Sequence, residues 1–417
     1  MNKCFSFCVF VLSLPSFALA QQAPPAHVHG SSGAPSEARD ASGTSWLPDE
    51  SPMFAVHAMR GDWRFMTHGS AFLQYLHDAG DRGQEQTGSI NWAMASAARE
   101  LGRARLQLRG MVSFESWTVG GCGYPDLLAS GELCDGEAIH DRQHPHDLWM
   151  ELAARYDRPL GRSLRLEVYG GPAGEPALGP VAFPHRPSAM PNPLAPISHH
   201  WLDATHVAFG VATAGVAGTS WKAEASAFNG REPDDARRNL DLAPLDSFSG
   251  RVWFLPTPRW ALQVSGGHLE EAEADEHSSS RTDVDRLTAS ATYHRAVDRY
   301  FWATTVAWGR NAEPEASASN ALLVETNLTF RERDTLFARF ESVNKTAHDL
   351  GLDATGELLV SKVQGGYTRY FPAWKALQGG IGASVSVSIV PASLAPAYGG
   401  RVVGGYGVFL TLRPSAK

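Results

Sequence analysis

The sequence predicts an all-β protein: a transmembrane, antiparallel, up-and-down β-barrel of about sixteen strands. Three observations lead to this prediction. Apolar and polar residues alternate with a period of two through most of the chain after residue 61, short and long connections take turns, and aromatic residues gather at one end of the expected strands.

The first twenty residues are typical of a secretory signal peptide. Lys3 precedes an apolar run over residues 5–14, and the segment ends in Ala18-Leu19-Ala20. Cleavage after Ala20 leaves 36 − 1 = 35 basic residues against 44 acidic ones, a net charge of 35 − 44 = −9. Because nucleic acid attracts the opposite charge, we expect an exported protein that binds none.

Residues 21–61 are rich in Pro, Ser, Ala and Gly and show no periodicity. A segment of this composition cannot bury enough apolar surface to fold alone. We therefore expect a flexible N-terminal leader over residues 21–61, followed by the barrel over residues 62–417.

The alternation that defines the strands is clear in RLQLRGMVSFES, where Leu106 and Leu108 fall on one face and Arg105 and Arg109 on the other. The same pattern recurs to the end of the chain. The predicted strands are 62–77, 88–100, 103–118, 148–158, 162–172, 206–217, 220–230, 246–256, 259–271, 284–296, 299–310, 319–332, 335–346, 358–371, 376–390 and 398–413.

Short connections between these strands alternate with long polar ones, which are 78–87, 119–147, 173–205, 231–245, 272–283, 311–318, 347–357 and 391–397. Short turns in the periplasm and long loops outside the cell are typical of outer-membrane barrels. Aromatic residues beside the short turns, such as Trp221, Trp260 and Trp302, fit an interfacial girdle. A soluble all-β protein is the alternative, but it would not need an apolar face on every strand.

A barrel of this size leaves room for water inside, so its inner face should be polar. The alternation assigns charged residues of both signs to that face, and we expect most of them to form cross-strand salt bridges. The lumen-lining residues predicted in this way are Arg105, Arg109, Glu115, Arg165, Glu167, Lys222, Glu224, Arg339 and Glu341.

At this level the chain resembles the Gram-negative outer-membrane β-barrel class, and it is porin-like in strand number and in having no separate plug domain. The segments HDRQHPHD and FPHRPSAMPNPLAPISHHWLDATHVAFG also resemble an uncharacterised exported barrel family, some of whose members are linked to heavy-metal handling. The resemblance implies a location in the outer membrane, contact with its lipid, and a link to metal.

Two long loops on the same rim carry most of the chain's metal-ligating side chains. Imidazole and carboxylate groups suit Zn or Cu, so these loops could form a transition-metal site. The candidate ligands are His140, His144, His146, Asp147, His199, His200, Asp203 and His206, with Asp141 nearby. None of the strict zinc spacings is present, so histidines that are only hydrogen-bonded in a loop folded into the lumen remain the alternative.

Only Cys122 and Cys134 remain after signal cleavage, and we expect them to form a disulfide outside the cytoplasm.

The function predicted from these features is a porin-like channel for small polar solutes, with a His-rich region that binds a transition metal, Zn or Cu. It leaves open a homo-oligomer and whether the long loops close the lumen. One alternative is a barrel enzyme acting on lipid or envelope substrates, for which Ser188 or Ser198 would be the nucleophile, although no Gly-x-Ser-x-Gly elbow is present. A structural or adhesion barrel is the other alternative.

Overall fold

The structure is a computed structural model that describes residues 37–274, 281–314, 317–352 and 357–415. The predicted signal peptide and the first part of the predicted leader lie outside these residues. The strands are β1 (Val56–Arg60), β2 (Trp63–Asp78), β3 (Glu85–Leu101), β4 (Ala104–Val112), β5 (Tyr124–Cys134), β6 (Glu137–Gln143), β7 (Trp149–Pro159), β8 (Arg165–Ala173), β9 (Val211–Ala217), β10 (Trp221–Phe228), β11 (Ser247–Thr257), β12 (Trp260–Ala274), β13 (Arg281–Val297), β14 (Tyr300–Ala312), β15 (Ser319–Phe330), β16 (Asp334–Thr346), β17 (Glu357–Tyr370), β18 (Leu377–Ile389) and β19 (Val402–Pro414). The helices are η1 (Glu37–Arg39), α1 (Glu115–Thr118), η2 (Phe183–His185), α2 (His199–Leu202), η3 (Ala204–His206), η4 (His348–Leu350), η5 (Ala392–Leu394) and α3 (Ala395–Tyr398). None of the helices in these ranges is long and apolar enough to cross a membrane.

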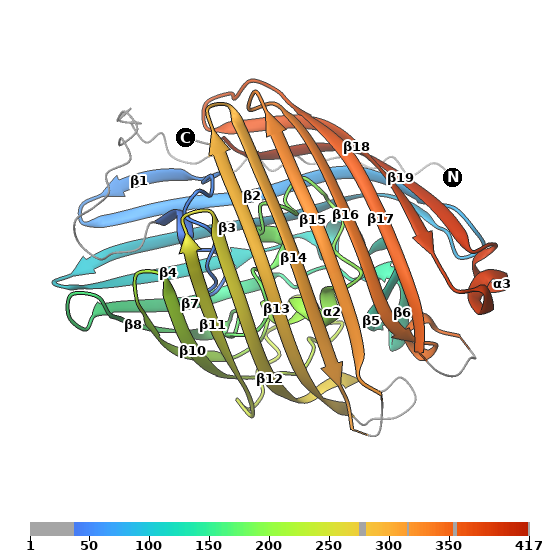
Figure 1. Ribbon diagram of the computed structural model, residues 1–417, viewed down its shortest axis with the longest axis horizontal. Helices are drawn as coiled ribbons and strands as arrows, with labels where there is room; N and C mark the ends of the chain where they lie inside the picture. Colours follow the sequence, from blue (N-terminus) through green and yellow to red (C-terminus); the bar gives the residue numbers. More distant parts are fainter. Residues whose placement is uncertain (1–36, 275–280, 315–316, 353–356, 416–417) are drawn as a thin grey trace, which may run out of the picture. The chain divides into compact units, whose positions relative to one another are not determined.

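Sixteen antiparallel strands form a closed ring (Figure 1), which confirms the predicted barrel. β2, β3, β4 and β7 to β19 each pair with the next strand, and β19 closes the ring by pairing with β2 from Gly405↔Asp78 to Leu412↔Ala71. β1 pairs with the remaining part of the same β2 edge, from Val56↔Thr67 to Arg60↔Trp63. A closed sheet satisfies its backbone hydrogen bonds internally, as a chain that spans a bilayer must.

The two faces of the wall follow the predicted alternation. In β10, Trp221 is exposed while Lys222, Glu224 and Ser226 are buried. In β18, Ile381 and Val385 are exposed while alternate serines are buried. The expected aromatic girdle includes a contact between Trp260 and Tyr293, whose ring centres lie 4.9 Å apart. The outer face is therefore apolar and the inner face polar.

One predicted strand is too long. Strand 103–118 ends as β4 at Val112, and residues 115–118 form the short helix α1. The chain turns there because the Ser113 hydroxyl accepts a hydrogen bond from the Glu115 backbone N–H, and the Asn91 side chain accepts one from the Phe114 backbone N–H. Glu115, predicted to line the lumen from a strand, instead reaches inward from α1 and is 0% exposed.

The described part of the predicted flexible leader differs from that prediction. Residues 37–55, here called the leader segment, lie within the barrel, and residues 42–48 are all buried. Trp46 is fully buried with Leu47 against wall residues such as Trp253. The inner wall also pairs with the segment's polar groups, since Arg155 contacts Asp40 at 3.1 Å. A segment too polar to fold alone is therefore held by surfaces that the barrel provides.

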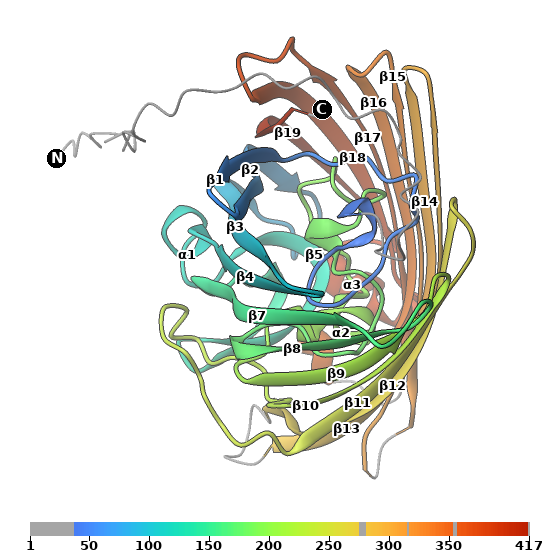
Figure 2. The same cartoon turned by 90° about the vertical axis from the view of Figure 1, so that its left-hand side faces the viewer.

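The long connection between β8 and β9 also lies inside the ring (Figure 2). Residues 174–210, here called the plug loop, contain η2, α2 and η3, and almost all of them are buried. The loop extends to Gly210 because the predicted strand 206–217 begins only at Val211. Among the described residues, this loop therefore fills much of the lumen.

Candidate metal centre

The plug loop is fixed to the wall on several sides. The Arg186 guanidinium, 0% exposed, pairs with Glu325 of β15 at 2.5 Å and with Asp203 of the loop itself at 3.0 Å. The Asn192 side-chain amide donates to Gln364 of β17 at 2.6 Å, and the Gly179 backbone N–H donates to Ser265 of β12 at 2.8 Å. Because these contacts reach strands far apart in the ring, the loop crosses the lumen and does not hang from one rim.

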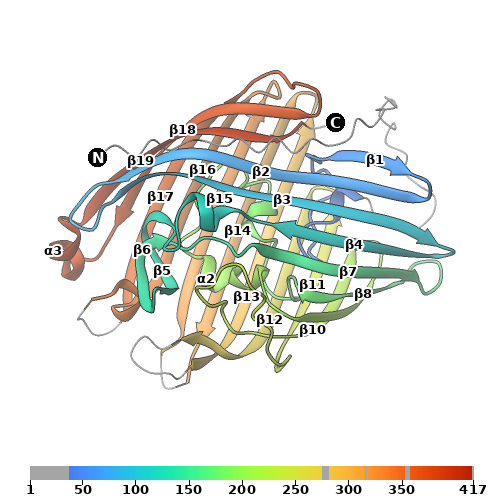
Figure 3. The same ribbon diagram turned by 180° about the vertical axis from the view of Figure 1, so that it is seen from behind.

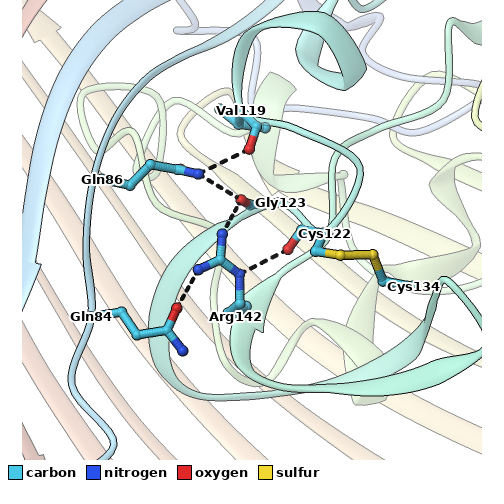
Figure 4. The surroundings of a disulfide bond; sticks show 7 residues. All are labelled: Gln84, Gln86, Val119, Cys122, Gly123, Cys134 and Arg142. Atoms are coloured by element: carbon cyan, nitrogen blue, oxygen red, sulfur yellow. Dashed lines mark hydrogen bonds between the residues drawn. A yellow bond between two sulfur atoms is a disulfide. The ribbon is translucent and has the colours of Figure 1, made fainter. Parts of the chain in front are cut away.

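A second loop, between the strands β4 and β7 next to β8 and β9, reaches the same region. Residues 119–147, predicted as a long polar loop, contain the hairpin β5–β6 (Figure 3), and Leu127 and Leu128 of β5 pack in one cluster with Trp201 of α2. The predicted disulfide is present: Cys122 and Cys134 are joined, with Cα atoms 5.3 Å apart. Arg142 of β6 donates to the backbone carbonyls of Cys122 and Gly123 (Figure 4). The base of the loop that carries His144 and His146 is therefore firmly held.

The two loops bring four of the predicted histidines together. The ring centres of His146 and His206 lie 5.2 Å apart, and those of His199 and His206 lie 5.1 Å apart. His144 lies at the edge of this group, 6.4 Å from His146 and 6.3 Å from His199. Phe183 packs against His146, His199 and His206 and covers them with an apolar ring.

Three of these rings are oriented in the same way. His146 Nδ1 donates to the Glu115 carboxylate at 2.9 Å, and His199 Nδ1 donates to the Asp203 carboxylate at 2.8 Å. His206 Nδ1 donates to the Asp203 backbone carbonyl, also at 2.8 Å. Because all three acceptors lack a hydrogen, each Nδ1 carries the proton and each neutral ring keeps its lone pair on Nε2. Metal-binding histidines are oriented by oxygen acceptors in this way. We call His146, His199 and His206 the His centre.

The closest approach in the His centre joins two of these Nε2 atoms. His146 Nε2 and His206 Nε2 lie 3.1 Å apart. Two neutral imidazoles so oriented would point one lone pair at another, an arrangement that a shared proton or a metal ion would stabilise. Burial strongly lowers the pKa of His206, which disfavours the proton.

The other predicted ligands have different partners. His140 Nδ1 lies 3.0 Å from the Asp349 backbone carbonyl, and Asp147 pairs with Arg237 at 3.4 Å. Asp141 accepts hydrogen bonds from Arg82 and from the Leu128 backbone N–H. His140 and Asp141 face other parts of the loops because they lie in the β5–β6 hairpin, which sequence reasoning missed. Asp147 follows the hairpin and is held by Arg237.

Two more predicted ligands, Asp203 and His200, have partners that give them roles other than metal binding in the His centre. Asp203 orients His199 with one carboxylate oxygen and pairs with Arg186 through the other, so it positions the centre and is not free to bind a metal. His200 Nδ1 lies 3.0 Å from Glu232, and ligand atoms of His200, Glu232 and Glu273 lie within 4.8 Å of one another. Neither glutamate could be predicted from the sequence, because Glu232 and Glu273 lie in separate loop and strand segments with no spacing that links them.

The lumen-facing charges lie in a dense network. Lys222 lies between Glu167 at 3.4 Å and Glu224 at 3.3 Å. Arg165 also contacts Glu167, and Arg109 pairs with Glu151 at 3.1 Å. At the plug loop, Arg339 pairs with Glu325 at 3.2 Å, while Glu341 accepts hydrogen bonds from the backbone and hydroxyl of Ser198. Arg105 is half-buried near the short turn after β3.

The two candidate nucleophiles also hold the plug loop to the wall. Ser188 Oγ donates to Glu325 at 2.8 Å, and Ser198 Oγ donates to Glu341 at 2.7 Å. Each hydroxyl is thus engaged by a wall carboxylate.

The buried histidines predict a pH-dependent stability. Burial lowers the pKa of His144, His185, His199 and His206 below the ordinary value of 6.5, and the Asp203 carboxylate partly offsets this at His199 and His206. A group with a lowered folded-state pKa binds fewer protons when folded, so its contribution is complete above pH 6.5 and is lost as pH falls below it. We expect the free energy of unfolding to fall between pH 7 and pH 5.5, by up to about 1.4 kcal/mol per pH unit for each histidine. Urea unfolding in lipid vesicles at several pH values measures the slope. The variant His206→Gln should show a smaller slope, and a stability that is constant or rises over this range would contradict the prediction.

Comparison with known proteins agrees with the fold. No known family model matches the chain, and no curated protein matches its sequence. OmpF of Salmonella typhi, solved in complex with daunomycin, aligns with a TM-score of 0.51 at 10% identity, over 86% of this chain and 100% of that one. This chain has the fold of an outer-membrane porin.

Two further structures align less closely. The anion-selective porin from Comamonas acidovorans aligns with a TM-score of 0.49 at 10% identity, over 84% of this chain and 99% of that one. OmpT of Vibrio cholerae, in its trimer form, aligns with a TM-score of 0.49 at 9% identity, over the same shares of the two chains. At these identities the likeness concerns the fold. The link to heavy-metal handling and the homo-oligomer stay predictions.

Proposed function

We propose that this protein is an outer-membrane channel of the porin type for small polar solutes, narrowed by the plug loop, and that its His centre binds Zn(II) or Cu(II). The observation that carries the metal part is the 3.1 Å separation of His146 Nε2 and His206 Nε2. Two imidazole nitrogens bound to one tetrahedral zinc ion, each about 2.0–2.1 Å from it, lie roughly 3.3 Å apart.

The surroundings of the His centre support a metal ion over a shared proton. Glu115 is 0% exposed and faces the rear of His146, so it fixes the ring and raises the electron density of its ligating nitrogen. Asp203 does the same for His199 and is itself held by Arg186. The third imidazole, His199, adds a further neutral donor beside the pair. Such a donor set suits Zn(II) and Cu(II).

The channel part is supported by the wall. An apolar outer face fits lipid, and an inner face that carries both signs of charge fits water and polar solutes. Because the plug loop fills much of the lumen, we expect the intact protein to conduct less than an open barrel of sixteen strands does.

Removing the two facing nitrogens should abolish metal binding. In the variant His146→Gln + His206→Gln, we expect the affinity for Zn(II) or Cu(II) to fall by about 100-fold or more, since a site loses two ligands. Calorimetric titration of the purified, folded protein measures this change. His140→Gln is the matched control: this residue lies in the same loop but bonds to the Asp349 carbonyl, so its removal should leave the affinity unchanged. Indistinguishable titrations of wild type and the double variant would end the metal proposal.

Conductance in planar lipid bilayers tests the channel proposal separately. Folded wild-type protein should give small but measurable single-channel currents in potassium chloride. Bilayers that show no current above the protein-free background would remove the channel, whatever the metal titrations show.

The structure gives less support to the two alternative functions, an enzyme and an adhesion barrel. For an enzyme, both candidate serines donate to wall glutamates, which explains their burial without a catalytic role. For an adhesion barrel, the two longest connections, 119–147 and 173–205, are folded into the lumen and are not displayed for a partner.

A further inference from the structure

A cavity of about 110 Å³ lies between the plug loop and the wall formed by β2, β3 and β4, towards the short-turn end of these strands. Its lining is unusual in composition. The chain has 8 methionines, and four of them line this one cavity together with three histidines. The seven residues are Met53, Met66, Met94, Met190, His57, His68 and His185.

The strand register explains why these residues meet. His68 of β2 stands directly opposite Met94 of β3, and Met94 stands opposite Met111 of β4. One row below, His57 of β1 stands opposite Met66 of β2. Directly opposed residues share one face of the sheet, so these side chains all project into the lumen.

The plug loop supplies the other side of the cavity. The His185 ring lies 4.6 Å from the Trp92 ring and 5.4 Å from the His68 ring. Its Nε2 atom lies 3.3 Å from the sulfur of Met111. His185 lies between two prolines that also line the cavity, Pro184 and Pro187, so the backbone that presents the ring is stiff.

Imidazole nitrogen approaches thioether sulfur three times in this region. His57 Nε2 lies 3.1 Å from Met53 Sδ, and His68 Nε2 lies 2.8 Å from Met94 Sδ. The contact between His185 and Met111 is the third. A hydrogen bond from N–H to thioether sulfur is weak, so it contributes little against the cost of burying His185 and half-burying His57 and His68. A cation that binds both atoms would stabilise the arrangement far more.

The charges around the cavity select the type of cation. Imidazole and thioether donors are neutral, and Asp40 is the single carboxylate among the described lining residues, where it pairs with Arg155 at 3.1 Å. Three arginines, Arg64, Arg105 and Arg109, also line the cavity. Arg109 pairs with Glu151 at 3.1 Å and Arg64 pairs with Glu100 at 3.5 Å. With no spare negative charge, the cavity favours a singly charged ion over a divalent one. Thioether sulfur is a soft donor that selects Cu(I) over harder ions.

We propose that this Met/His cavity is a second metal site, specific for a soft monovalent ion such as Cu(I), with ligands drawn from the lining residues Met66, His68, Met94 and His185 and from Met111, which lies beside the lining in contact with His185. It is separate from the His centre, whose donors are imidazoles oriented by carboxylates and suit a divalent ion. The proposal goes beyond the proposed function and does not depend on it.

The test uses full-length mature protein folded in detergent, with Ag(I) in chloride-free buffer and Cu(I) under anaerobic conditions as probes. Wild type should compete for one equivalent of either ion against a chelator of known affinity. The variant Met66→Leu + Met94→Leu + Met111→Leu keeps side-chain volume and removes the sulfur, so affinity for both ions should fall by roughly 100-fold or more. Met150→Leu is the matched control, because this buried methionine of β7 lies outside the cavity lining and should not change the affinity.

Two further measurements make the result decisive. X-ray absorption of the Cu(I)-loaded wild type should show sulfur in the first coordination shell, and a shell of nitrogen and oxygen alone would overturn the proposal. Absence of binding by wild type, or equal binding by the folded triple variant, would also overturn it. The variant His146→Gln + His206→Gln should bind Ag(I) as wild type does, so a failure of the His centre and a failure of this cavity can be told apart.

Discussion

Replacing Arg186 with alanine is expected to loosen the plug loop and raise single-channel conductance several-fold. Arg186 is 0% exposed and holds two carboxylates, Glu325 on the wall and Asp203 within the loop. It also donates to the Val181 backbone carbonyl at 2.7 Å. Removing one partner of a buried ion pair leaves an uncompensated charge and costs about 3–5 kcal/mol. The cost destabilises only the position of the loop inside the lumen, because both carboxylates are exposed to water when the loop moves away.

Planar-bilayer recordings of Arg186→Ala beside wild type measure this effect directly. Arg259→Ala is the matched control: Arg259 pairs with Glu50 at 2.9 Å, but its side chain is 47% exposed, so the pair contributes no more than about 1 kcal/mol. The control should conduct as wild type does. An Arg186→Ala protein that folds and conducts no better than wild type would show that this pair does not hold the lumen closed.

Replacing Lys222 with methionine is expected to lower the free energy of unfolding by about 3 kcal/mol. The Lys222 ammonium is 0% exposed and lies between Glu167 and Glu224, and it donates to the Thr44 carbonyl of the leader segment. It also lies 4.8 Å from the centre of the Trp46 ring, within range of a cation–π contact. Its loss both leaves carboxylates underpaired and detaches the leader segment.

Urea unfolding in lipid vesicles gives the change in stability, and limited proteolysis reports release of the leader segment. Lys375→Met serves as the control, since Lys375 lies on a turn over Trp374, which is 71% exposed. That substitution should change the stability by no more than about 0.5 kcal/mol. Equal stability of the Lys222→Met and Lys375→Met proteins would mean that the buried lysine is not a structural link.

The barrel wall could be predicted from sequence because its signal is local. Trp221 and Lys222 fall on opposite faces of β10 for the same reason that Ile381 and Ser384 do in β18: neighbouring side chains on a strand point in opposite directions. Because the outside of the closed barrel contacts lipid, the apolar face of each strand is the outer one. The prediction failed at Glu115, where hydrogen bonds to Asn91 and Ser113 turn the chain out of the sheet.

The contents of the barrel could not be predicted in this way. Arg186 and Glu325 are 139 residues apart, and no local periodicity links them. The leader segment reads as flexible because its own composition cannot form a core, whereas Trp46 is buried by residues of the wall. The His centre was located in part, since its three histidines come from the two loops named in advance. Its orienting carboxylates, Glu115 of α1 and Asp203 of the plug loop, lie in turns that a period-two pattern does not predict. His140 faces elsewhere because it lies in the β5–β6 hairpin, which that pattern did not show either.

The contacts of the plug loop have a consequence for the stiffness of the wall. The loop bonds to β12, β15 and β17, which do not pair with one another. It therefore acts as an internal brace, so a force that displaces one of these strands is resisted by the other two as well as by the strand's own neighbours.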